Sequence, residues 1–126
     1  MSVVLLDRGF FSFSVINALE RNERGFLMLC TLFGGIRRAV MEYSEGERMR
    51  VCRYAIGLEG SRATFTLVIL PKTGAARDEN DPPKKFIPFA TNKPGERVMW
   101  NGRRLPIRYR MMRCIESRYI GVEQLN

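Results

Sequence analysis

The stretch VVLLDRGFFSFSVINALERNERGFLMLCTL, residues 3–32, decides the fold. Its first five residues, 3–7, form an apolar run rich in β-branched side chains and predict a buried strand. Ser12 or Ser14 can then cap a helix through VINALERN, and residues 26–32 predict a second buried strand. A strand–helix–strand unit favours a parallel crossover, so we expect an α/β fold.

The next segments contain one more helix and several strands. IRRAVMEYSEG, residues 36–46, predicts a helix that ends at a glycine. Residues 48–56 and 63–71 are separated by a turn and predict an antiparallel hairpin. Residues 86–92 predict a further strand, in which Pro88 indicates an edge position or a bulge.

The chain is expected to form a single partial domain over residues 1–126. We divide it into a βαβα core portion at 1–46, a β-rich insertion at 47–100 and a C-terminal helix within 101–126. The segment 72–85 is expected to be a mobile loop, and VMWNGRRLP to be irregular. The first strand should lie inside a sheet, yet nothing precedes it, so we expect a fold that lacks its N-terminal strands.

Composition excludes several classes of protein. No apolar run is long enough to span a bilayer, and the start lacks the basic lead and cleavage site of a signal peptide, so we expect a cytoplasmic protein. The absence of histidine excludes histidine-based catalysis and disfavours a Cys/His zinc site. The three cysteines are far apart in the sequence and form no CxxC pair: Cys30, Cys52 and Cys114. We expect them to be buried, reduced thiols, as free cysteines usually are.

Positive charge is concentrated in the second part of the chain. The net charge is +8; residues 1–46 contain five basic and five acidic side chains, and residues 47–126 contain sixteen and eight. From residue 97 to 118, seven arginines stand against one acid, Glu116. Such a stripe is typical of a protein that binds a polyanion, usually nucleic acid. A basic surface without a partner is the alternative.

Asp7 and Glu116 are the carboxylates that could carry chemistry. Asp7 ends a strand, at the edge where open α/β sheets bind ligands. On a C-terminal helix, Glu116 would share a face with Tyr109 and Arg113. If that helix packs near Asp7, two carboxylates within a basic cleft form a site for Mg²⁺. The alternative is a local ion pair between Glu116 and Arg113.

Three segments resemble the DDE transposases of the insertion-sequence-four type. VVLLDRGFFSFSVINALE is similar to the family's segment around the second catalytic aspartate, where an apolar strand enters an Asp-Arg-Gly-Phe/Tyr turn. FTLVILPK followed by FIPFATN resembles the strands before the last helix, where a Thr-Asn pair recurs, here Thr91 and Asn92. YRMMRCIESRY resembles the helix with the third catalytic acid. Order and spacing agree from residue 3 to about residue 124.

The resemblance implies roles for individual residues. Asp7 matches the second metal-binding acid and Glu116 the third, so these two would be catalytic and would ligate Mg²⁺. Tyr109 matches the signature tyrosine and Arg110 a basic residue that often follows it. Together with Arg113, these residues would contact the DNA backbone.

The chain also departs from the family pattern. The signature arginine falls on Met112, the tryptophan after it on Arg113, and a basic residue expected near the end on Glu123. The family's first catalytic aspartate lies upstream of the second and has no counterpart here. The resemblance therefore implies little or no strand transfer by this chain alone.

The expected fold is a partial ribonuclease-H-like core with a β-rich insertion, and the expected function is DNA transposition by a truncated enzyme. Its partners would be transposon-end DNA and a separately encoded N-terminal half or a second copy of the chain, at the nucleoid. The alternatives are a non-catalytic DNA-binding remnant and an unrelated basic α/β module with the two carboxylates far apart. Four further cations could contact phosphates or simply be solvated: Lys84, Lys85, Arg103 and Arg104.

Overall fold

Strands β1 (Val3–Leu6) and β2 (Gly25–Leu29) pair in parallel through the crossover helix α1 (Phe13–Arg21), as the sequence predicts. The register places Val3 opposite Gly25 and continues to the end of β1. Ser12 is the N-cap of α1, and its hydroxyl accepts a hydrogen bond from the Val15 amide at 3.2 Å.

The structure, a computed structural model, describes residues 3–32, 34–71, 80–95, 97–100, 103–106 and 123–125. Beyond the elements above, these residues form η1 (Arg8–Phe10), α2 (Gly34–Ser44), β3 (Val51–Ile56), β4 (Ala63–Pro71), η3 (Pro82–Lys85), β5 (Phe86–Thr91), β6 (Arg97–Trp100), β7 (Arg103–Pro106) and β8 (Glu123–Leu125).

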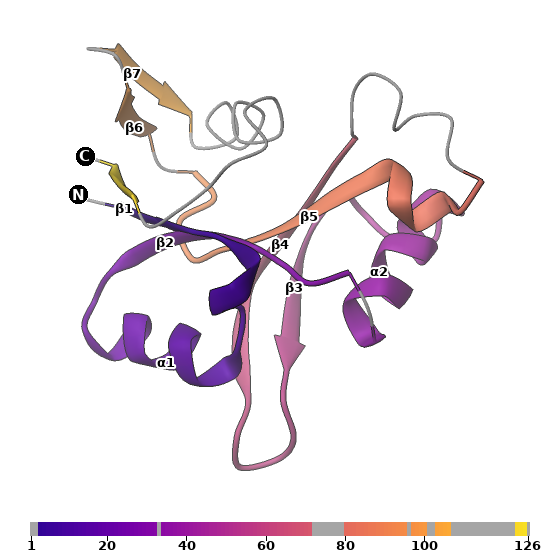
Figure 1. Cartoon of the computed structure of the whole chain (residues 1–126), viewed down its shortest axis with the longest axis horizontal. Helices are drawn as coiled ribbons and strands as arrows, with labels where there is room; N and C mark the ends of the chain where they lie inside the picture. The colour runs from indigo at the N-terminus through magenta and orange to yellow at the C-terminus, as the bar shows by residue number, and fades with distance from the viewer. Residues whose placement is uncertain are drawn as a thin grey trace.

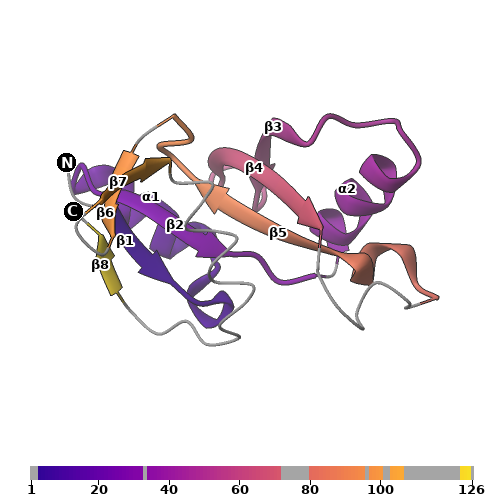
Figure 2. The ribbon, with the colours of Figure 1, turned by 90° about the horizontal axis from the view of Figure 1, so that it is seen from above.

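One mixed sheet organises these elements, in the strand order β3-β4-β5-β2-β1-β8 (Figures 1 and 2). The β3–β4 hairpin is antiparallel, as predicted, and β5 is antiparallel to both β4 and β2. The α/β class is thereby confirmed. The strands expected in the β-rich insertion join the sheet of β1 and β2 directly.

Both faces of this sheet contain buried side chains, because successive residues of a strand point to opposite faces. On one face, Phe26 and Met28 of β2 pack with Ile16 of α1 and Val40 of α2. Both helices cover this face, as Figure 1 shows. The opposite face carries a second buried group: Val3, Leu5, Leu27, Val68, Leu70 and Phe89.

Pro88 lies in an interior strand, so the edge position predicted for it is wrong. Ile69 of β4 is opposite Pro88 of β5. The Ile69 amide points away from β5, however, and donates to the Arg50 carbonyl at 2.9 Å. Toward β2, the Pro88 carbonyl accepts from the Cys30 amide at 3.0 Å, beyond the last paired residue, Leu29. Proline has no amide N–H to donate. At Pro88 that lack lies just beyond the last residue pair of the β2–β5 ladder, so the ladder loses no hydrogen bond.

A second hairpin lies in the region expected to be irregular. Strands β6 and β7 pair antiparallel, with Trp100 opposite Arg103. The two residues between them in the sequence are Asn101 and Gly102, the strongest short signal for a two-residue hairpin. That pair predicts the hairpin, so the expectation of an irregular segment is wrong.

The helix expected within 101–126 is wrong at its C-terminal end, and no helix precedes it at Arg103–Pro106. Arg103 and Arg104 lie on β7, and residues 123–125 form β8, antiparallel to the outer edge of β1. Residues 107–122, which include YRMMRCIESRY, lie outside the described part of the chain.

The Thr91–Asn92 pair fastens the end of β5 to the beginning of β2. The fully buried Thr91 hydroxyl donates to the Phe26 carbonyl at 2.7 Å and accepts from the Lys93 amide at 3.0 Å. Asn92 accepts from the Phe26 amide and donates to the Arg24 carbonyl, both at 2.9 Å. The pair thus has a structural task that accounts for its chemistry.

We predict that Thr91→Val lowers the free energy of unfolding by about 1–3 kcal/mol, because the isosteric change leaves the Phe26 carbonyl and the Lys93 amide unpaired in or near the core. Urea denaturation measures the loss. Thr64→Val, at an exposed position of β4, is the matched control and should change stability by less than about 0.5 kcal/mol. Equal effects of the two substitutions would contradict this role of Thr91.

Candidate functional site

Asp7 directly follows β1, at the edge of the sheet where β2 also ends. It is the N-cap of η1: its Oδ1 accepts from the Gly9 amide at 2.9 Å, and its carbonyl accepts from the Phe10 amide at 3.2 Å. A Cβ at Gly9 would lie 3.1 Å from Asp7 Oδ1. The Asp-Arg-Gly sequence therefore forms a tight turn that orients the carboxylate.

The turn leaves part of the Asp7 carboxylate available to a ligand. Among the described residues, only the Gly9 amide donates a hydrogen bond to this carboxylate, and the bond goes to Oδ1. A carboxylate has about four lone-pair sites, so Oδ2 can bind a cation without disturbing the turn. Carboxylate oxygens are ligands that Mg²⁺ prefers.

The short helix η1, which begins at Arg8, contacts β2. Burial raises the pKa of the Cys30 thiol, just after β2, and the positive charge of Arg8 opposes that rise. Cys30 is buried and free, as the sequence predicts, whereas Cys52 is only half-buried and Cys114 lies outside the described residues.

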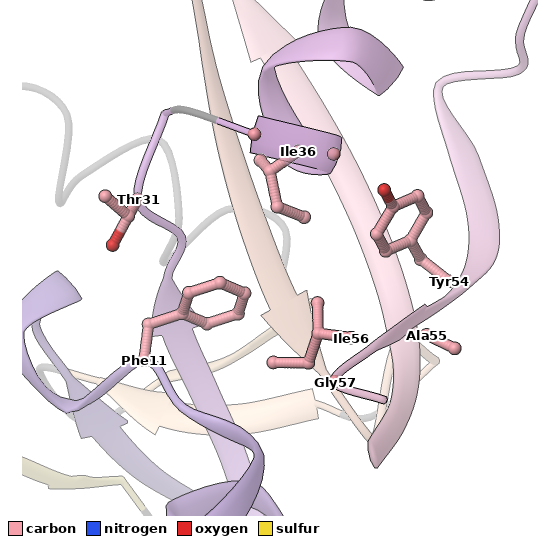
Figure 3. A pocket seen from close by; sticks show the side chains of 9 residues that line it. Phe11, Thr31, Ile36, Tyr54, Ala55, Ile56 and Gly57 are labelled. Carbon is pink, nitrogen blue, oxygen red and sulfur yellow. The ribbon is translucent and has the colours of Figure 1, made fainter. Parts of the chain in front are cut away.

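A pocket of about 400 Å³ opens beside the Asp7 turn (Figure 3). It lies between the loop after η1, the N-terminal end of α2 and the end of β3. Figure 3 shows the Phe11 ring and the Ile36 side chain directed toward its interior, with the Tyr54 hydroxyl pointing toward α2. Its lining residues are Phe11, Thr31, Gly34, Gly35, Ile36, Tyr54, Ala55, Ile56 and Gly57.

The pocket is apolar with two hydroxyl groups, and none of its lining residues is charged. Phe11 also packs edge-on against Phe65 of the core, with ring centroids 5.8 Å apart. A Cβ at Gly35 would collide with the Tyr54 hydroxyl, so any side chain there would displace the Tyr54 ring. Such a lining suits an apolar side chain or ligand.

Lys84 and Lys85 are exposed at the end of η3, immediately before β5. β5 begins at the same edge of the sheet at which β2 ends, because the two strands are antiparallel. η3 lies against α2, and Arg37 of α2 forms an ion pair at 2.7 Å with Asp81, the N-cap of η3. Part of the predicted loop 72–85 is therefore an ordered turn.

The Arg37–Asp81 ion pair keeps the Asp81 carboxyl, close before these lysines, ionised to lower pH. The hydrogen bond from Arg37 is the main cause that lowers the pKa of Asp81, and the charges of Arg37 and Lys84 lower it further. A carboxyl whose folded-state pKa is lowered stabilises the fold above its unfolded-state pKa, and this contribution is lost as the pH falls through the folded value.

We predict that Arg37→Gln raises the pKa of Asp81 toward the ordinary range for aspartate, because the charged partner is removed. Carbon-detected NMR titration of the Asp81 carboxyl measures the change. Arg38→Gln, which removes the neighbouring exposed charge, is the control and should leave the Asp81 titration nearly unchanged. An Asp81 titration identical in wild type and Arg37→Gln would contradict the ion pair.

The remaining predicted site residues are not gathered around Asp7. Both views place the β6–β7 hairpin, which carries Arg103 and Arg104, beside the start of β1, at the opposite end from Asp7 (Figures 1 and 2). Four further predicted residues lie outside the described part of the chain: Tyr109, Arg110, Arg113 and Glu116. Within the described ranges, no three His, Cys, Asp or Glu side chains are close enough to hold a metal ion.

Several arginines that the charge pattern would assign to phosphate binding are engaged within the protein. Arg48 forms an ion pair with Glu42 at 2.7 Å and lies over the Tyr54 ring. Arg50 donates to the Tyr43 hydroxyl at 3.0 and 3.1 Å. The basic character of residues 47–56 is therefore partly structural.

Sequence reasoning did not identify the pocket. Its residues come from three segments, around Phe11, at the start of α2 and at the end of β3, and each alone resembles an ordinary core or turn sequence. The closeness of Gly35 to Tyr54 depends on the sheet topology, which the sequence did not predict.

Comparison of the chain with protein-family models, with curated proteins and with solved structures gives no match. In the described part of the chain, neither α1 nor α2 has the length and apolar character needed to cross a membrane.

Proposed function

We propose that the chain is the C-terminal part of a DDE-type transposase catalytic domain, which binds DNA and would hold Mg²⁺ through Asp7 and Glu116. The observation that carries the proposal is the position of Asp7. It follows a buried parallel strand, and the Gly9 amide fixes its carboxylate while one oxygen stays available.

The chemistry of this carboxylate fits a divalent cation. Asp7 supplies a hard oxygen ligand, and its Oδ1 bond to Gly9 restricts its rotation. Mg²⁺ bound there would neutralise negative charge that develops on a phosphodiester. Asp7 alone holds such an ion weakly, so the proposal requires a second carboxylate, for which Glu116 is the candidate by its resemblance to the third catalytic acid.

The parallel β1–β2 crossover supports the ribonuclease-H-like part of the proposal. In this interpretation, β1 is the strand of the second acid, and the outer edge of β1 is where the strand of the first acid would pair. In this chain the three-residue strand β8 pairs with that edge.

DNA would approach the sheet edge that Asp7 and the two lysines share. Lys84 and Lys85 are exposed, and within the described residues neither forms an ion pair. Exposed lysines contact phosphates without reading sequence, which suits binding along the duplex backbone. Arg103 and Arg104 lie at the other end of β1 and would contact a separate part of the DNA.

We predict that the double variant Lys84→Gln/Lys85→Gln binds a fluorescent duplex several-fold more weakly than wild type at low salt. Each lost phosphate contact should reduce the slope of log K against log salt by about 0.9. Fluorescence anisotropy over a salt series measures both quantities. Arg21→Gln/Arg62→Gln removes the same charge from two exposed positions away from η3 and should weaken binding less.

Two results would contradict DNA binding at this edge: equal weakening by the two double variants, or wild-type binding that does not respond to salt.

Cleavage assays separate the proposed enzyme fragment from a non-catalytic remnant. Nicking only after addition of a chain that carries the first acid indicates a complementing half. No nicking with any such chain indicates a DNA-binding remnant, and nicking by the chain alone contradicts its incompleteness.

A further inference from the structure

Leu58 and the pocket beside the Asp7 turn lie next to each other on the surface. Leu58 is 82% exposed, the highest value among the exposed large apolar residues of the described chain. It begins the turn between β3 and β4, which the hydrogen bond from the Ser61 amide to the Leu58 carbonyl closes at 2.8 Å. Gly57, the preceding residue, lines the pocket. A protruding leucine and an apolar hollow thus share one patch.

We propose that two copies of the chain associate through this patch, with Leu58 of each copy inserted into the pocket of the other. A patch that contains both the protrusion and the hollow is self-complementary under a two-fold axis. The pairing therefore closes as a dimer. A protrusion and a hollow on separate surfaces would instead propagate an open chain of copies.

The pocket is large enough to take a leucine side chain, and its wall is largely apolar. Its volume is about 400 Å³, and Phe11, Ile36 and Ile56 supply an apolar wall. Burying an exposed leucine side chain favours association, and a symmetric pair buries two of them. Phe10 and Phe13, on either side of Phe11 in the chain, are 40% and 39% exposed.

Charge complementarity supports a second copy as the occupant. Glu59 is exposed and follows Leu58, so insertion of Leu58 brings this carboxylate to the pocket entrance of the other copy. That entrance includes the N-terminal end of α2, formed by Gly34 and Gly35, where the helix dipole favours negative charge. Arg38 in the first turns of α2 adds positive charge. The acid and the basic helix end would meet twice in one dimer.

Analytical ultracentrifugation tests the interface without any nucleic acid, because the dimer would form whether or not the chain binds DNA. We predict a reversible, concentration-dependent dimer for wild type and a monomer for Leu58→Asp at the same concentrations. Met49→Asp is the matched control: Met49 is 77% exposed and lies before β3, away from the pocket, so this variant should remain dimeric. A monomeric wild type, or a dimeric Leu58→Asp, would overturn the proposal.

Disulfide trapping between two single variants tests the contact directly. A Thr31→Cys chain mixed with a Leu58→Cys chain should give covalent heterodimers under mild oxidation, because Thr31 lines the pocket. Mixing Thr31→Cys with Met49→Cys controls for random cross-linking and for the native cysteines. Equal yields from the two mixtures would exclude Leu58 from the pocket of the second copy, even if the chain dimerises by another surface.

Discussion

The attachment of β2 to strands on both of its sides is the constraint on which the rest of the structure depends. β1 pairs with β2 in parallel on one side, and β5 pairs with it antiparallel on the other. Thr91 and Asn92 add side-chain hydrogen bonds to the backbone of Arg24 and Phe26, at the beginning of β2. Without these bonds, the β3–β4–β5 portion would be joined to the β1–α1–β2 unit by fewer contacts.

This arrangement determines where chemistry can occur. Because β1 and β2 are parallel, the turn at Asp7 and the chain segment after β2 leave the sheet at the same edge. Because β5 is antiparallel, Lys84 and Lys85 precede it at that edge as well. The end of β3, which leads into the turn that contains Leu58, completes the wall of the pocket next to the Asp7 turn. One sheet topology thus places the Asp7 turn beside an apolar hollow, and directs the two lysines to the same end of the strands.

Local sequence signals predicted the elements but not their lateral order. Apolar runs and the Ser12 cap identify β1, α1 and β2, because these signals depend on neighbouring residues. The interior position of Pro88 could not be predicted, since it depends on which way the Ile69 amide points and on where β2 ends. The pocket depends on contacts between distant segments. The β6–β7 hairpin could be predicted from Asn101 and Gly102, because this pair of residues is typical of a two-residue hairpin turn.

Mn²⁺ titration followed by amide NMR tests most directly the proposed site, in which Asp7 and Glu116 bind one divalent cation. Paramagnetic broadening should reach the Gly9 amide at low Mn²⁺ concentration in wild type. It should be lost in Asp7→Asn, which keeps an Oδ1 acceptor for Gly9, and equally in Glu116→Gln. Broadening at Gly9 that survives either substitution, or that never reaches Gly9, would contradict a shared metal site.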